Sequence, residues 1–254
     1  MLRPFKIIYE YFALYSSLTL LGLICLTWSL FAVPLYFILP RRIGTSIGRR
    51  GIMLGFRMYA WSLSITRAYY LDLRAIDSLR GGPPVILAPN HPCLIDALLI
   101  LTRHPNIVCV MKSSLMRNVF LGSGSRLARY VPNDSSRQMV KESVAHLLEG
   151  GVLLLFPEGT RTTRAPINSL VASVGLIAKH ANVPVQTLVI ETDSPYLSKG
   201  WPLFRRPTLP ITYRVRLGKR FAPPADVAAF TVELDRYYRR ELEGALQSRW
   251  LKGA

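Results

Sequence analysis

Apolar side chains dominate the first forty residues of the chain, and residues 11–40 contain no charged side chain. Residues 12–34 supply the roughly 20 mainly apolar positions that a helix needs to cross the hydrocarbon core of a bilayer. Pro34 would break a helix and several hydroxyl side chains weaken the apolar run, so a hairpin fits as well as a single span. The pattern predicts a membrane-associated helical element over residues 1–66, with an N-terminal hydrophobic membrane helix or helical hairpin.

The segment 43–65 mixes arginines with large apolar side chains. Its composition suits a helix in the headgroup layer of a membrane, with Arg49, Arg50 and Arg57 on lipid phosphates and apolar side chains such as Trp61 just below. A partly exposed packing helix with solvated arginines fits the same pattern equally well. The pattern leaves both interpretations open.

From Ala68 onward, short runs typical of strands alternate with stretches of helical periodicity. This alternation is typical of α/β domains, in which helices cover a central sheet. We expect a layered α/β fold with a mixed central sheet flanked by helices, formed by one domain over residues 67–254. Strands are predicted at 69–73, 85–87, 107–111, 152–156, 185–190 and 211–217, and helices at 92–102, 136–148, 170–180 and 225–249.

The chain carries a strong positive charge, which narrows the classes of partner. Its 32 Lys and Arg residues exceed its 15 Asp and Glu residues, giving a formal net charge of +17. Nucleic acids, anionic lipid headgroups and phosphorylated substrates are all attracted by such a surface. A nucleic-acid-binding domain has no use for the long uncharged segment, and no recognised nucleic-acid-binding motif is present. We therefore expect anionic membrane lipids as partners, and no nucleic acid.

The basic residues that flank the apolar segment predict its orientation. Two precede it, Arg3 and Lys6, whereas five arginines follow it, at positions 41, 42, 49, 50 and 57. Because positively charged flanks stay on the cytoplasmic side, we expect the remaining domain to face the cytosol at the inner membrane. A cleaved signal peptide is the rival interpretation, but the apolar run is too long and no cleavage site of small residues precedes a plausible mature start.

Three cysteines, Cys25, Cys93 and Cys109, show no paired spacing and no nearby cluster of histidines. Neither a disulfide framework nor a zinc site is indicated, and the cysteines fit a reducing compartment. We expect no metal site.

The run 84–96 combines a buried strand with two side chains that can act together in proton transfer. His91 lies where the strand ends, in the position where open α/β sheets bind ligands. Asn90 or His91 would cap the next helix, Pro92 would lie in its first turn, and Asp96 just over one turn in. A carboxylate on one imidazole nitrogen raises the basicity of the other, which can then remove a proton from an alcohol. Taken alone, such a pair is more often structural.

A second run, 150–161, leads another buried strand into the glycine turn Phe-Pro-Glu-Gly-Thr-Arg. Arg161 can bind a phosphate through two parallel hydrogen bonds, and Gly159 lets the backbone approach a ligand closely. Glu158 is expected either to orient Arg161 or to bond an acceptor hydroxyl. A tight turn with an ordinary surface ion pair is the alternative for this segment taken alone.

Together, the segments Asn-His-Pro-Cys-Leu-Ile-Asp at 90–96 and Phe-Pro-Glu-Gly-Thr-Arg at 156–161 closely resemble the 1-acylglycerol-3-phosphate acyltransferase family. The resemblance extends across roughly residues 68–217. It implies that His91 and Asp96 are catalytic. It also implies that the second segment binds the phosphate of the acceptor, through Glu158, Gly159, Thr160 and Arg161.

The resemblance implies transfer of a fatty acyl chain from acyl-CoA or acyl carrier protein to the hydroxyl of a lysolipid, at the membrane, without metal or cofactor. The leading acceptor is 1-acylglycerol-3-phosphate, which would give phosphatidate. Lys112 fits an intermediate motif of the family and is added to the substrate-binding residues. Asn133 or Asp134 stands where that motif has an arginine, which leaves Arg129 and Arg137 as candidate replacements. Another lysolipid, such as an amino-acid lipid or a specialised lipid, is therefore a serious alternative acceptor.

The sequence also bears on the mechanism. It contains no Gly-x-Ser-x-Gly elbow, and no Ser or Cys is placed as a convincing nucleophile, so direct attack by the hydroxyl of the substrate is the simpler reaction. A lipid esterase and a non-enzymatic anionic-lipid-binding protein are the rivals. A binding protein does not need a pair such as His91 and Asp96, which favours an enzyme.

Overall fold

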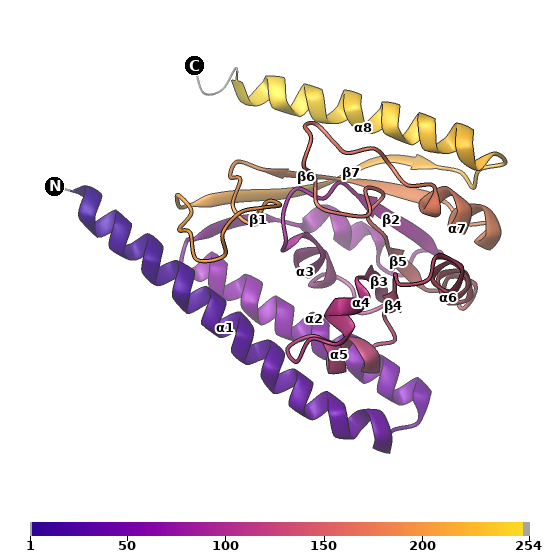
Figure 1. The fold of residues 1–254 in the computed structure, drawn as a ribbon, viewed down its shortest axis with the longest axis horizontal. Coiled ribbons are helices and arrows are strands. Elements are labelled where there is room, and N and C mark those ends of the chain that lie inside the picture. The colour runs from indigo at the N-terminus through magenta and orange to yellow at the C-terminus, as the bar shows by residue number, and fades with distance from the viewer. Residues whose placement is uncertain (1, 251–254) are drawn as a thin grey trace.

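The computed structural model describes residues 2–250 of the chain, and the side chains of residues 4–243. Its centre is a seven-stranded sheet with the order β1-β7-β6-β2-β5-β3-β4 (Figure 1). Strands β6, β2, β5, β3 and β4 run parallel, whereas β7 is antiparallel to β6 and parallel to β1. The predicted mixed sheet is confirmed. The strands are β1 Tyr69–Asp72, β2 Val85–Pro89, β3 Ile107–Met111, β4 Val131–Pro132, β5 Val152–Leu154, β6 Val185–Thr192 and β7 Ile211–Phe221.

Helices cover both faces of this sheet. Helices α7 and α8 lie on one side, and α2, α3 and α5 lie on the other (Figure 1). The layered α/β arrangement is confirmed. The helices are α1 Leu2–Ile38, α2 Arg41–Ile65, α3 Asp96–Leu101, α4 Ser113–Met116, α5 Gly122–Leu127, α6 Ser136–Leu148, α7 Ser173–Ala181 and α8 Val227–Trp250, with a 3-10 helix η1 at Arg74–Leu79.

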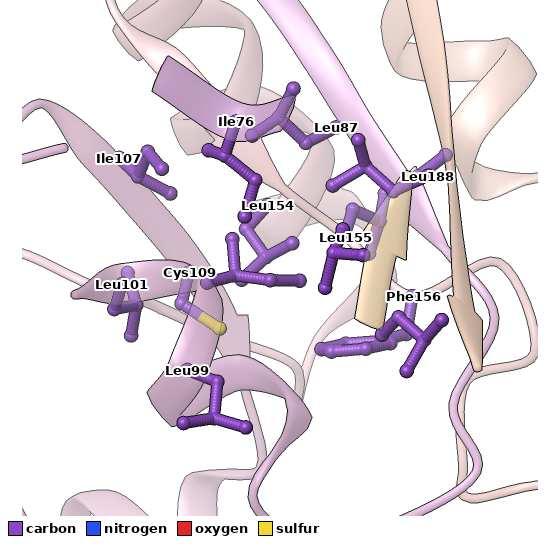
Figure 2. Packing of buried hydrophobic residues seen from close by; sticks show 14 of the residues in the cluster. Ile76, Leu87, Leu99, Leu101, Ile107, Cys109, Leu154, Leu155, Phe156 and Leu188 are labelled. Atoms are coloured by element: carbon purple, nitrogen blue, oxygen red, sulfur yellow. The ribbon is translucent and has the colours of Figure 1, made fainter. Parts of the chain in front are cut away.

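The burial of the strands follows from their place in the sheet. Every residue of β2 and β5 is buried, because central parallel strands are covered by helices on both faces. Leu87 and Leu154 pack together in this core, and Leu99 of α3 lies in the same cluster (Figure 2). Along β7, by contrast, buried and exposed positions alternate from Ile211 to Val215, so Tyr213 points into the protein.

Of the two arrangements left open for the N-terminal apolar segment, the structure has the single long helix, without a break at Pro34. Helix α1 is continuous for 37 residues and contains Pro34. The proline lacks an N–H, but backbone hydrogen bonds continue beyond it, with the Leu39 amide donating to the Leu35 carbonyl at 3.1 Å. The chain turns at Pro40, and α2 returns beside α1 in the opposite direction (Figure 1). By length and composition, α1 from Pro4 to Ile38 could cross a membrane.

Helix α2 uses glycines where it packs closely. A β-carbon at Gly51 would lie 2.2 Å from the Trp28 ring of α1, and one at Gly48 would lie 2.6 Å from the Ala128 backbone nitrogen. The helix therefore packs tightly on one face, while Leu54 and Trp61 on another face are exposed. Packing and exposure occur on the same helix, and contact of the exposed side of α2 with lipid headgroups stays a prediction. The division into 1–66 and 67–254 stays a prediction.

The helix predicted at 92–102 is shorter than expected. It begins at Asp96, after Ile95, and no side chain caps it, so the expected cap at Asn90 or His91 is wrong. The Asp96 carboxylate accepts a hydrogen bond from the Cys93 amide at 2.9 Å, which holds the preceding residues in a turn. Asp96 is therefore the first residue of α3, and His91 lies in the loop before it.

Candidate active site

Two loops meet at one edge of the sheet. Strands β2 and β5 are parallel neighbours, with Val85 opposite Val152, so the segments after them emerge side by side. The His91 amide donates to Glu158 Oε1 at 2.9 Å, and the Thr162 amide donates to the His91 carbonyl at 2.8 Å. The loop after β2 and the loop after β5, which carry the two motifs, are thus joined by hydrogen bonds at both the amide and the carbonyl of His91.

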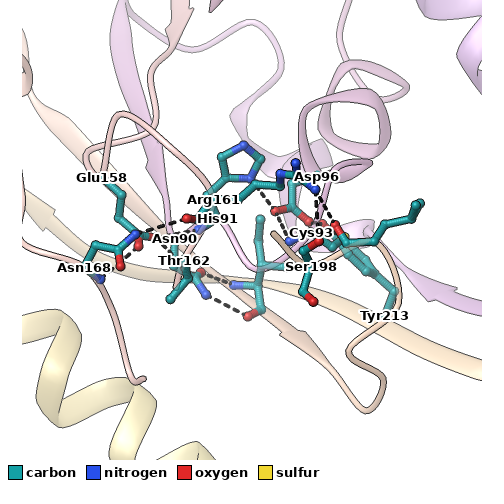
Figure 3. Close-up of polar contacts among 12 residues, drawn as sticks. Asn90, His91, Cys93, Asp96, Glu158, Arg161, Thr162, Asn168, Ser198 and Tyr213 are labelled. Atoms are coloured by element: carbon teal, nitrogen blue, oxygen red, sulfur yellow. Dashed lines mark hydrogen bonds and ion pairs between the residues drawn. The ribbon is translucent and has the colours of Figure 1, made fainter. Parts of the chain in front are cut away.

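His91 and Asp96 form a hydrogen-bonded pair. The distance from His91 Nδ1 to Asp96 Oδ2 is 2.7 Å (Figure 3). Because a carboxylate accepts, the proton lies on Nδ1 and the lone pair on Nε2. Nε2 has no protein partner within residues 2–250, and the His91 side chain is 16% exposed. The ring stacks on Phe156 with centroids 3.9 Å apart, which fixes its plane.

Further donors hold the Asp96 carboxylate, which is fully buried. Oδ1 accepts from the Tyr213 hydroxyl at 2.6 Å and from Cys93 Sγ at 2.9 Å, in addition to the bond from the Cys93 amide to Oδ2. Burial, followed by the proximity of Asp96, raises the pKa of both the Cys93 thiol and the Tyr213 phenol well above their usual ranges. Both groups stay protonated and donate, which offsets the cost of burying the carboxylate.

Tyr213 is a hydrogen-bond partner of Asp96 that sequence analysis missed. It lies on β7, 117 residues after Asp96, and only the paired strands bring the two together. Local sequence contains no signal for such a contact, although the alternating pattern of the strand at 211–217 places its side chain inward. Cys93 lies inside the first motif, but its contact with Asp96 depends on the turn that the structure reveals.

We expect Tyr213→Phe to lower kcat about tenfold and to leave the KM for the acyl acceptor unchanged. A hydrogen bond to a charged group is worth about 1.5–3 kcal/mol, and 1.4 kcal/mol corresponds to tenfold in rate. Initial rates across a pH series measure both parameters. Tyr238→Phe is the control, because it removes an equally buried phenol bonded to the Ala88 carbonyl. Equal losses in the two variants, or a change in KM alone, would contradict a role of Tyr213 through Asp96.

Glu158 joins the loops rather than pairing with Arg161. Its Oε1 accepts from the Thr162 hydroxyl at 2.8 Å as well as from the His91 amide, and its Oε2 accepts from the Asn168 amide at 2.9 Å. In the described part of the chain no ion pair joins Glu158 to Arg161, so the expected orientation of Arg161 by Glu158 is wrong. Burial raises the pKa of Glu158, and these hydrogen bonds oppose the rise. Its contact with an acceptor stays a prediction.

Arg161 is held by a third segment. Its Nη1 donates to the carbonyls of Leu197 and Ser198 at 2.9 and 3.1 Å (Figure 3). The Leu197 carbonyl also accepts from the Leu94 amide at 3.0 Å, so this segment, missed by sequence analysis, joins both motifs. Nε and Nη2, on the other edge of the guanidinium, have no partner among residues 2–250. That edge is free for a phosphate, which guanidinium binds through two parallel hydrogen bonds.

The other predicted binding residues lie around the same edge. Gly159 is exposed and has φ +64°, a conformation that favours glycine, and Thr160 beside it is half-buried. Lys112 is exposed and directly follows β3, the neighbour of β5. Its backbone therefore emerges at the edge that carries His91, two strand spacings or about 10 Å from β2. The structure brings these residues to one edge; their contact with substrate stays a prediction.

The two candidate replacements for the missing arginine lie in different places. Arg129 stacks on the Tyr36 ring of α1, 5.0 Å from its centroid. Arg137 lines a cavity of about 440 Å³ together with Val171. Val171 lies against Gly159, where a β-carbon would meet it at 3.8 Å. Of the two, Arg137 is therefore the one on the side of the second motif.

Comparison with known proteins agrees with this geometry. Residues 71–191 match the family model described as Acyltransferase, and this range contains both motifs. The fold also resembles the crystal structure of the 1-acyl-sn-glycerophosphate (LPA) acyltransferase PlsC from Thermotoga maritima, with a TM-score of 0.70 and 18% sequence identity over 96% of this chain and 98% of that chain. Residues 71–191, the part of the chain that carries both motifs, are therefore similar to the acyltransferase family.

Proposed function

We propose that this protein transfers a fatty acyl chain from an acyl thioester to the hydroxyl of a lysolipid. The observation that carries the proposal is the 2.7 Å bond between His91 Nδ1 and Asp96 Oδ2, with Nε2 of the partly exposed ring free of partners in the described part of the chain. The leading acceptor is 1-acylglycerol-3-phosphate, which would yield phosphatidate. The printed name of the similar Thermotoga maritima enzyme supports this choice.

His91 acts as general base in the proposed reaction. Its Nε2 takes the proton of the acceptor hydroxyl as that oxygen attacks the thioester carbonyl carbon. The tetrahedral intermediate collapses, the C–S bond breaks, and the thiolate takes the proton from the imidazolium. Asp96 stabilises the imidazolium while it exists. The Cys93 thiol is not the nucleophile, because its raised pKa keeps it protonated and its side chain is buried.

Positive charge at the same edge suits an acceptor that carries a phosphate. Arg161 offers the free edge of its guanidinium, and Lys112 adds a second cation. Pro92, Thr162 and Ser198 line a recess of about 420 Å³, and the carbonyl of Ser198 also accepts from Arg161. The proposed reaction is a proton transfer coupled to a displacement, chemistry that the pair supplies without a resident metal ion or cofactor.

The membrane is the proposed place of reaction. Helix α1 presents exposed apolar side chains along its length, among them Phe12, Leu30 and Phe37. We propose that α1 anchors the protein in the inner membrane and that the catalytic domain faces the cytosol, as the flanking arginines favour. Anchoring would bring the site to the surface where a lysolipid acceptor resides.

A product assay tests the proposal. The purified protein is mixed with a labelled acyl thioester, as acyl-CoA and as acyl carrier protein in parallel, with lysophosphatidate, with another lysolipid, or with no acceptor. We expect labelled phosphatidate only when lysophosphatidate is present. Because Asn133 replaces an arginine of the family motif, acylation of the other lysolipid instead would redirect the acceptor assignment. Labelled fatty acid without acceptor would indicate an esterase, and no turnover would indicate a binding protein.

A further inference from the structure

A second concentration of arginines lies away from His91. A recess of about 540 Å³ between α2 and the loops before β2 and β3 is lined by Arg42, Arg49, Arg50, Arg57, Arg80 and Arg103. Strands β2 and β3 run in the same direction, so the loops that precede them lie at the sheet edge opposite to the His91 loop. The five residues of β2 separate the two edges by about 16 Å. The recess is therefore distinct from the candidate active site.

Most of the charge in this recess is not neutralised by the protein. Asp77 pairs with Arg103 and, at 3.2 Å, with Arg80. The other four arginines form no ion pair within residues 2–250. Arg42 and Arg50 are exposed and, over the same residues, form neither a hydrogen bond nor an ion pair. Like charges held together repel, so a bound anion would stabilise the site.

Two of the arginines are held in place by backbone carbonyls. Arg49 Nε donates to the Ala128 carbonyl at 3.1 Å. Arg57 donates to the Thr102 carbonyl through Nε at 3.2 Å and Nη2 at 3.0 Å. These bonds position the guanidinium groups before any ligand arrives and leave further N–H groups available. A preorganised set of donors loses less conformational entropy on binding than free side chains do.

The recess borders the apolar surface of α2. Exposed Leu54, Met58, Trp61 and Ile65 recur every three or four residues and form one stripe along the helix. The arginines of α2 that line the recess are at positions 42, 49, 50 and 57. At 100° per residue, their mean direction lies about 100° around the helix from this apolar stripe. When the apolar stripe enters a bilayer, the arginines are at the level of the lipid phosphates.

We propose that this arginine recess binds the phosphate headgroup of an anionic membrane phospholipid, at a site separate from the substrate site. Guanidinium groups bind phosphate oxygens through paired hydrogen bonds, which favours a phosphate headgroup with a net negative charge over a headgroup of zero net charge. The adjoining apolar stripe accommodates the acyl chains of the same lipid. The inference rests on membrane association of α1 and α2 and does not depend on the acyltransferase activity.

Lipid retention by the detergent-solubilised full chain tests this site. Native mass spectrometry counts bound phosphatidylglycerol and phosphatidylcholine for the wild type, for R42Q/R50Q, and for R236Q/R240Q. The control pair is exposed on α8, across the sheet from α2, and removes the same charge. We expect phosphatidylglycerol to bind more tightly than phosphatidylcholine, and R42Q/R50Q to lose on the order of 30-fold in affinity, at about fivefold per arginine. R236Q/R240Q is expected to bind as the wild type does.

A second double variant, and competition by inorganic phosphate, distinguish binding of a lipid headgroup from an effect of charge alone and from binding of a free anion. R42K/R50K retains the charge but loses the paired donors, so its affinity is expected to fall between those of wild type and R42Q/R50Q. Equal retention by R42Q/R50Q and R236Q/R240Q, or equal binding of the two lipids, would overturn the proposal. Inorganic phosphate at millimolar concentration is expected to compete weakly. Full displacement of the lipid by phosphate would assign the recess to a free anion and would also overturn it.

Discussion

His91→Ala is expected to lower kcat for acyl transfer by about 10²- to 10⁴-fold, the range that general-base catalysis contributes. The variant removes the only nitrogen in the described site that is placed to take the proton of the acceptor hydroxyl. The loop keeps its position, because the amide and carbonyl of residue 91, not its side chain, make the bonds to Glu158 and Thr162. Thiol release and labelled lipid, measured together on purified protein, give the rate.

His180→Ala is the matched control for this variant. His180 is exposed on α7 and makes no hydrogen bond within residues 2–250, so its removal should leave the rate unchanged. A His91→Ala protein that keeps the melting temperature of the wild type and turns over within severalfold of it would contradict the proposed role of the imidazole.

Asp96→Asn is expected to lower kcat by up to about 10⁴-fold through the tautomer of His91. The carboxylate accepts from Nδ1 at 2.7 Å, whereas an amide NH₂ in that place donates to Nδ1 and moves the ring proton to Nε2. The base then has no lone pair toward the acceptor. The new NH₂ also faces the Cys93 amide, which loses its acceptor, and a buried unsatisfied donor costs about 1–3 kcal/mol. We therefore expect a lower melting temperature as well.

Two readouts separate these effects. Rates are measured well below the melting temperature of the variant, and Asp134→Asn, at an exposed position, serves as the control. If Asp96→Asn loses stability but keeps its rate below that temperature, Asp96 is structural and the proposed pair is not catalytic.

Elements with strong local patterns could be predicted from the sequence. The strand at 107–111 and the helix at 136–148 occur with the predicted bounds. Each shows a single hydrophobic periodicity, that of a helix or that of a strand. Each also ends near a clear termination signal: Gly150 and Gly151 follow the helix, and Lys112 follows the strand. The edge of the sheet that carries the site could also be predicted, because ligands bind where strands end in such sheets.

The contacts that complete the site could not be predicted. The bond from Tyr213 to Asp96 and the bonds from Arg161 to Leu197 and Ser198 join segments far apart in sequence. They depend on strand order and on loop conformation, neither of which has a local signature. The late start of α3 has the same origin, because the side chain of Asp96 satisfies the Cys93 amide and stabilises a turn instead of a helix.

The central claim is direct acyl transfer, with the acceptor hydroxyl activated by the pair and no acyl-enzyme formed. A single-turnover experiment with enzyme in excess over labelled acyl thioester tests it, by following the label in thioester, protein and lipid. The account predicts that label passes from thioester to lysophosphatidate with none bound covalently to protein, and that without acceptor the thioester stays intact. Label that appears first on the protein, on Cys93 or any other side chain, and then moves to lipid would contradict it.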